Sequence, residues 1–77
     1  MTEVWTLPDC PDCERVKTEL RAEGIPFAER SLLKLRKGEI LDVDAMTEVV
    51  MRDGKAPMVR VDGRFLSDNE LTAFLKG

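Results

Sequence analysis

The two cysteines of this chain, Cys10 and Cys13, are separated by two residues in the order Cys-Pro-Asp-Cys. They are the only cysteines among 77 residues. A largely apolar segment, residues 4–7, precedes them, and Val16 and Leu20 follow at helical spacing. A thiol pair at the start of a helix can cycle between dithiol and disulfide, because the unpaired N–H groups of the first turn stabilise a thiolate. The spacing therefore predicts thiol–disulfide exchange.

Each residue of the motif has a predicted role. We expect Cys10 to be the N-cap and the attacking thiol, with Pro11 at the first helical position, where a missing N–H costs nothing. Cys13 then lies on the same side, where it can resolve a mixed disulfide. Asp12 places negative charge beside the thiolate, and at about 7 Å this opposes ionisation by roughly 1 kcal/mol. We therefore expect Cys10 to be less acidic than in a site without this carboxylate.

The same cysteines are open to other interpretations. The chain has no histidine and no third cysteine, so a zinc site with four thiolate ligands would need two chains. An iron–sulfur cluster held between two chains with external thiols is a further alternative. Two inert core cysteines are a third. The position at a helix start favours the redox interpretation, in which the single chain has no metal site.

Composition limits the class of protein. With 35% charged and 43% hydrophobic residues, the chain is expected to be one soluble domain, residues 1–77. It contains no apolar run long enough for a membrane span. A net charge of −3 predicts no nucleic-acid partner. The acidic residues 1–3 lead straight into a strand, so no signal peptide is expected. Two closely spaced cysteines suit a reducing cytoplasm, where such a pair is catalytic or binds metal.

Apolar periodicity and turn residues divide the chain into four strands and three helices. The predicted strands are residues 3–7, 27–30, 58–61 and 64–66. The first helix is predicted to end at Gly24, the second to begin at Asp42 or Asp44, and the third to follow a capping box that starts at Ser67. Asp62-Gly63 predicts a two-residue hairpin turn. The order implies a parallel βαβ unit plus an antiparallel hairpin, which gives an α/β fold with a four-stranded mixed sheet flanked by three helices on both faces.

Some residues have a simpler structural interpretation. Trp5 is expected in the core, and Arg15 and Lys17 are either ordinary surface charges or an offset to the acidic site. Residues 31–41 fit neither a helical nor a strand period. They are left unassigned, as a solvated basic loop or a leucine-containing partner or dimer patch. The inner face of the second helix is predicted from apolar spacing to be Val43, Met46, Val49 and Val50.

The motifs together resemble the glutaredoxin branch of the thioredoxin superfamily. They are Cys-Pro-x-Cys after the first strand, Ala56-Pro57 before the third, the Asp-Gly hairpin and the final capped helix. The resemblance implies a thioredoxin-like, glutaredoxin-type fold in which Pro57 is cis and faces the cysteines. It implies that the backbone of Ala56 pairs with substrate as an added strand. It also implies a monomeric thiol–disulfide oxidoreductase that acts on protein disulfides. On the same resemblance, we expect no bound cofactor, and we expect the Cys10–Cys13 disulfide to be recharged by glutathione or thioredoxin reductase.

Three departures separate this chain from family members that use glutathione. Leu7 replaces a lysine, Asp12 replaces an aromatic residue, and Leu66-Ser67 replaces a Gly-Gly pair. Asp68 and the start of the last helix remain as a possible carboxylate dock. Residues 5–10 and 56–63 are similar to the glutaredoxin-like small redoxins, which donate electrons to ribonucleotide reductase and are recharged by thioredoxin reductase. The expected substrate-binding residues are Pro11, Asp12, Ala56, Pro57, Ser67 and Asp68.

Overall fold

The computed structural model describes residues 1–77, and its four strands form one mixed sheet in the order β2-β1-β3-β4. The central strand β1 (Thr2–Thr6) pairs in parallel with β2 (Ala28–Ser31). On its other side β1 pairs in antiparallel fashion with β3 (Met58–Val61), which pairs with β4 (Arg64–Phe65). The βαβ unit and the antiparallel hairpin are therefore confirmed, with strand ends within one residue of those expected.

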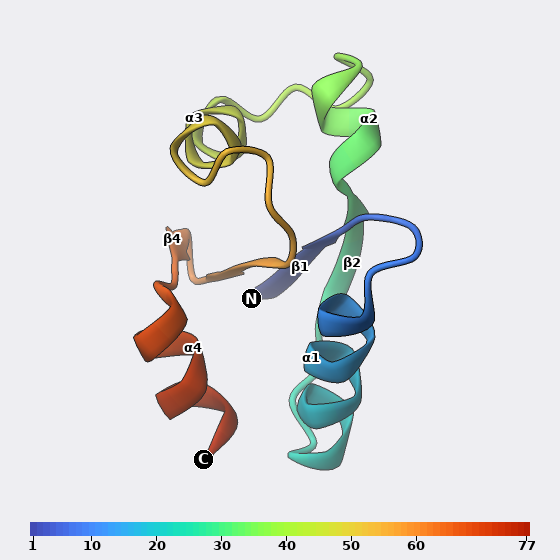
Figure 1. Ribbon diagram of the computed structural model, residues 1–77. Helices are drawn as coiled ribbons and strands as arrows, with labels where there is room; N and C mark the ends of the chain where they lie inside the picture. The colour runs from blue at the N-terminus through green and yellow to red at the C-terminus, as the bar shows by residue number, and fades with distance from the viewer.

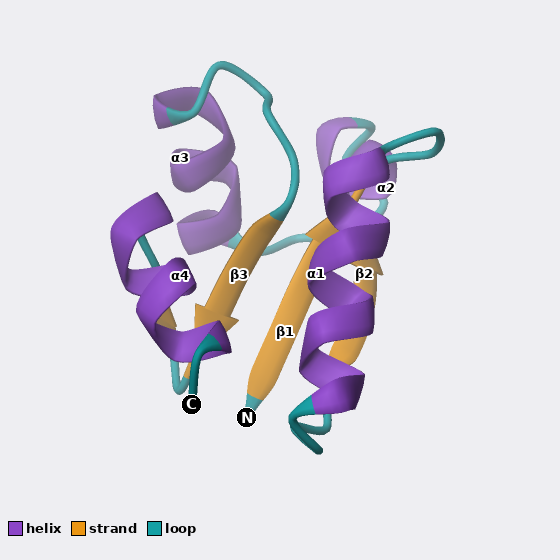
Figure 2. Ribbon diagram, turned by 60° about the horizontal axis from the view of Figure 1, so that its bottom comes forward, coloured by secondary structure: helices purple, strands orange, loops and turns teal.

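Two pairs of helices cover the two faces of the sheet. α1 (Pro11–Ala22) and α4 (Asp68–Leu75) lie on one face, below the sheet in Figure 1. α2 (Leu32–Arg36) and α3 (Val43–Met51) lie on the other (Figures 1 and 2). The helices on both faces and the mixed sheet confirm the thioredoxin-like α/β fold. None of the helices has the length and apolar content that crossing a lipid bilayer requires.

The alternation of side chains along the strands produces two separate cores. Val4 and Val59 face α1 and α4, while Trp5 and Met58 face α2 and α3. All four side chains are fully or almost fully buried. Trp5 is thus a core residue, as expected. Both helical layers are held to the sheet by the hydrophobic effect, which stabilises a buried side chain of this size by about 1.5–3 kcal/mol.

Residues 31–41, which had no predicted element, contain the short helix α2. Ser31 caps this helix, and its hydroxyl accepts a hydrogen bond from the Lys34 amide at 3.3 Å. Leu32 and Leu35 are buried against Trp5. The fold thus has four helices rather than three. A helix of about one and a half turns is too short to produce a recognisable apolar period, so α2 depends on its cap and its packing.

The predicted inner face of α3 is wrong at two of its four positions. Val43 and Val50 are 78% and 75% exposed, whereas Ala45 and Val49 are buried. Val43 and Val50 are seven residues apart and Ala45 and Val49 are four apart. Both pairs fit a helical period, so periodicity alone could not tell which pair is buried. Asp42, the N-cap, accepts hydrogen bonds from the Ala45 amide and from Arg60 on β3, and these contacts hold the helix with Ala45 against the sheet.

The end of α1 shows why the first helix stops where predicted. Gly24 has a φ of +70°, a conformation that favours glycine. Its N–H donates to the carbonyl of Arg21, and the N–H of Ile25 donates to that of Leu20. This is the Schellman arrangement, which satisfies the last carbonyls of a helix. The chain then turns back into β2, which runs parallel to β1.

Candidate active site

Cys10 and Cys13 form a disulfide at the start of α1, with their Cα atoms 5.2 Å apart. Cys10 has the extended backbone of an N-cap, and its Sγ accepts a hydrogen bond from the Cys13 amide at 3.1 Å. Pro11 occupies the first helical position. Cys13 is fully buried, whereas Cys10 remains partly exposed. Of the two sulfurs, that of Cys10 is therefore the one that an incoming molecule can reach.

The segment before β3 lies directly beside Cys10. The Ala56–Pro57 peptide bond is cis, as the resemblance implied. Cys10 Sγ lies 4.0 Å from the carbonyl oxygen of Ala56. Neither the N–H nor the carbonyl of Ala56 has a backbone hydrogen-bond partner. These free groups, next to a reachable sulfur, can pair with an extended peptide.

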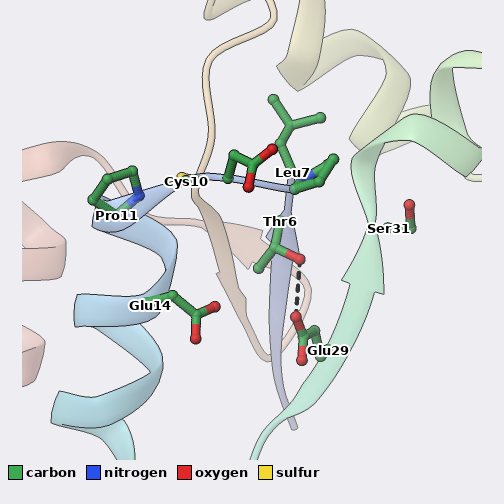
Figure 3. Close-up of a pocket in the computed structure, with 9 residues that line it drawn as sticks. Thr6, Leu7, Cys10, Pro11, Glu14, Glu29 and Ser31 are labelled. Atoms are coloured by element: carbon green, nitrogen blue, oxygen red, sulfur yellow. Dashed lines mark hydrogen bonds between the residues drawn. The ribbon is translucent and has the colours of Figure 1, made fainter.

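One hollow, which we call the acidic pocket, adjoins Cys10 on the side of β2 (Figure 3). Glu14 contributes a carboxylate from α1 and Glu29 one from β2. Asp9 adds a third from the preceding loop, where it has a φ of +55°. Pro11 lies at its edge near Cys10 (Figure 3). The reachable sulfur is thus bordered on this side by negative charge.

Lys17 binds two of these carboxylates and is not an ordinary surface charge. Its side chain is only 10% exposed, and Nζ lies 2.6 Å from Glu14 and 2.9 Å from Glu29. The Thr6 hydroxyl also donates to Glu29 at 3.0 Å. The hydrogen bonds that Lys17 donates to Glu14 and Glu29 raise the pKa of Lys17, and the bond that Glu29 accepts from Lys17 lowers the pKa of Glu29. The ion pair between Lys17 and Glu29 joins α1 to β2 beside the acidic pocket.

A second hollow, which we call the proline groove, adjoins the site on the side of α3 and α4. Ala56 and Pro57 line it between the two layers, together with Asp12 and Asp68. Cations also line it, so its charge is mixed; they are Arg15, Arg52 and Lys55. The groove therefore collects four of the six residues expected to bind substrate.

Ser67 lines neither the acidic pocket nor the proline groove. Its hydroxyl accepts from the Glu70 amide at 3.2 Å, and its own N–H donates to the Glu70 carboxylate at 2.9 Å. These two bonds form the predicted capping box of α4. The bond that the Ser67 N–H donates to the Glu70 carboxylate lowers the pKa of Glu70, and a hydrogen bond from Arg64 adds to this effect. The polar groups of Ser67 are thus occupied in starting the helix.

Sequence reasoning missed the residues that β2 brings to the site. Ser31 pairs in register with Thr6, so the ends of the parallel strands meet beside the β1–α1 loop. Glu29 reaches the acidic pocket from the same strand. The predicted parallel pairing contained this signal, since parallel strands end at the same edge of a sheet. Arg52 was missed as well; it lines the proline groove and donates to the carbonyl of Leu66.

Residues 2–66 match the family model described as Glutaredoxin. The chain belongs to the glutaredoxin family. This match covers β1 through β4, with both cysteines and the Ala56–Pro57 bond. The Cys10–Cys13 disulfide at the helix start is consistent with thiol–disulfide redox activity in this family. A comparison with curated proteins found no match.

Solved structures share the fold at low identity. The chain is 24% identical to the thioredoxin-like protein BC3987 over 99% of this chain and 97% of that one, with a TM-score of 0.65. A silkworm (Bombyx mori) glutathione S-transferase described as diazinon-metabolizing is 23% identical over 99% and 35% of the two chains, with a TM-score of 0.65. A glutaredoxin from Archaeoglobus fulgidus is 19% identical over 99% and 86%, with a TM-score of 0.56. At these identities the likeness concerns the fold alone.

Proposed function

We propose that this protein is a thiol–disulfide oxidoreductase that reduces disulfides in other proteins. One observation carries the proposal: the partly exposed sulfur of Cys10 lies at a helix start, 4.0 Å from a carbonyl of Ala56 that has no backbone partner. An extended peptide paired with Ala56 would bring its own sulfur next to Cys10. The N–H of Cys13, which donates to Cys10 Sγ, would stabilise the thiolate in the reduced protein.

The order of steps follows from the positions of the Cys10 and Cys13 sulfur atoms. The Cys10 thiolate attacks one sulfur of the substrate disulfide, which forms a mixed disulfide and releases the other substrate sulfur as a thiolate. Cys13, which is buried behind Cys10, then attacks Cys10 Sγ as a thiolate. This closes the Cys10–Cys13 disulfide and releases the second substrate thiolate. Two electrons pass to the substrate, and its two sulfurs take up two protons from solvent.

Single-cysteine variants test this assignment. Cys10→Ser should lose disulfide reduction, because the attacking sulfur is gone. Cys13→Ser should retain the first attack and accumulate a mixed disulfide, which mass spectrometry detects as an adduct that dithiothreitol removes. Identical behaviour of the two variants would contradict the proposal. Protein purified without air that contains one metal per dimer and blocked thiols would also contradict it, in favour of a zinc or iron–sulfur module.

We further propose that a thioredoxin reductase reduces the Cys10–Cys13 disulfide at least as well as glutathione does. Leu7 supplies no cation beside the cysteines, and it packs against the core next to Trp5. Leu66 is buried, and its carbonyl already accepts a hydrogen bond from Arg52. The carboxylates of Asp9 and Asp12 repel an anionic tripeptide. These features support the likeness to the small redoxins that serve ribonucleotide reductase.

Comparison of the two reductants tests this second proposal. The oxidised protein is mixed either with NADPH and thioredoxin reductase or with glutathione, NADPH and glutathione reductase. Oxidation of NADPH should be at least as fast in the first mixture. Rapid turnover only with glutathione would contradict the proposal and leave the oxidoreductase assignment intact.

A further inference from the structure

Four of the six large apolar side chains that are exposed lie within residues 41–51. Leu41, Val43, Val50 and Met51 are each at least 75% exposed, and together we call them the α3 apolar face. Ala45 and Val49 occupy the opposite side of the same helix, against the sheet. Exposed apolar side chains are ordinary when scattered, whereas a contiguous patch of this size on a small protein often binds a partner.

The α3 apolar face continues into the proline groove. Val43 and Val50 are seven residues apart, so they lie on one line along the helix, separated by about 10 Å. Met51, the next residue, lines the groove together with Pro57. Figure 2 shows that the end of α3 leads through a loop to the start of β3. A molecule that reaches Cys10 through this groove can therefore extend along α3.

The area of the face indicates what kind of molecule covers it. Four such side chains expose on the order of 600 Å², less than the roughly 800 Å² per partner that a stable interface buries. The face is thus too small to hold a second copy of this chain by itself. It is adequate as an extension of a transient contact, the class to which redox encounters belong.

We propose that the α3 apolar face is a docking surface for the protein whose disulfide or thiol exchanges with Cys10. This inference rests on the proposed oxidoreductase function and adds the class of partner. The partner presents an apolar patch of its own, next to the segment that carries its reactive sulfur. Asp44, Asp53 and Lys55 are exposed near the face along the chain, so its border carries both signs of charge.

The test replaces only residues that lie outside the proline groove. In Val43→Ser/Val50→Ser, both side chains are exposed in the wild type, so the fold should be retained and circular dichroism should show an unchanged melting curve. Ala73→Ser, an exposed change on α4, is the control. Each protein is assayed with insulin, with NADPH and thioredoxin reductase, and with hydroxyethyl disulfide as a small substrate.

The expected result is selective. For at least one of the two protein probes, kcat/KM of the double variant should fall by about five- to tenfold, whereas the control stays unchanged. With hydroxyethyl disulfide, kcat/KM should remain within about twofold, because this molecule covers only the sulfur. A double variant that equals wild type with both proteins would overturn the inference. An equal loss of kcat/KM with the small disulfide would also overturn it. So would sedimentation that shows a dimer for the wild type and a monomer for the double variant. A wild type inactive toward every disulfide would instead contradict the proposed function.

Discussion

Opposing charges surround Cys10 at the scale of single residues. Asp12, in the first turn of α1, is exposed and lies close to the sulfur along the chain. The carboxylate of Asp12 lies 3.8 Å from the guanidinium of Arg15, which partly compensates its charge. Arg15 itself is shared with Glu19 at 3.4 Å. Because the compensation is incomplete and the pair is exposed to solvent, a destabilising effect on the Cys10 thiolate is expected to persist.

Asp12→Asn should therefore lower the pKa of Cys10 in the reduced protein, by less than about one unit. The physical reason is the loss of a negative charge that opposes thiolate formation, while the amide keeps the size of the side chain. Ultraviolet absorbance of the thiolate during a pH titration measures the change. Glu23→Gln, at the far end of α1, is the control and should leave the titration unchanged. An unchanged or higher pKa in Asp12→Asn would refute the effect.

At the scale of elements, rotation of α3 determines which apolar side chains are exposed. Asp42 accepts a hydrogen bond from the Ala45 amide at 3.0 Å and another from Arg60 at 2.7 Å. At the other end, Arg52 donates to Glu48 within the helix and to the carbonyl of Leu66 beyond it. The helix is therefore held at both ends by polar contacts to the β3–β4 hairpin and its exit. These contacts leave Val43 facing solvent, where the proposed docking surface lies.

At the scale of the whole molecule, one guanidinium connects the sheet to α3. Arg60 lies on β3 and donates to Glu3 on β1 at 2.7 Å and 2.9 Å, and to Asp42 at the start of α3. Its guanidinium lies 5.7 Å from the ring centroid of Trp5 and 5.1 Å from that of Phe65. The hydrogen bonds from Arg60 hold the pKa of Glu3 and that of Asp42 below their ordinary values. Folding is thus linked to the ionisation of two carboxylates.

This linkage predicts acid sensitivity. Carboxylates whose pKa is lower in the folded protein stabilise it above their ordinary values, 4.5 for Glu3 and 3.8 for Asp42. This stability is lost as the pH falls through the lower, folded values. The melting temperature should therefore be steady near neutral pH and fall steeply below about pH 4.

Glu3→Gln should lower stability at neutral pH by roughly 2 kcal/mol, because Arg60 loses a charged partner. It should also flatten the decline in acid. Thermal melts followed by Trp5 fluorescence between neutral and acidic pH measure both effects. The exposed change Glu39→Gln should alter neither, and an acid decline in Glu3→Gln as steep as in the wild type would rule out this linkage.

Adjacent residues are sufficient to specify much of this protein. Cys10 and Cys13 could be recognised as a redox pair at a helix start because an N-cap and a proline act within one turn. The end of α1 at Gly24 and the capping box at Ser67 were predicted for the same reason. The order of these elements then led to the parallel and antiparallel pairings of the sheet.

Only the tertiary structure decided which faces are buried and what surrounds the sulfur. Val43 and Ala45 fit helical periodicity equally well, and a contact to Arg60, 18 residues from Asp42, selects between them. Lys17 is buried because β2 brings Glu29 beside α1. Such choices depend on contacts between residues that are distant in the chain, and no local pattern encodes them. Glu29 in the acidic pocket and Met51 in the proline groove were therefore found only in the folded molecule.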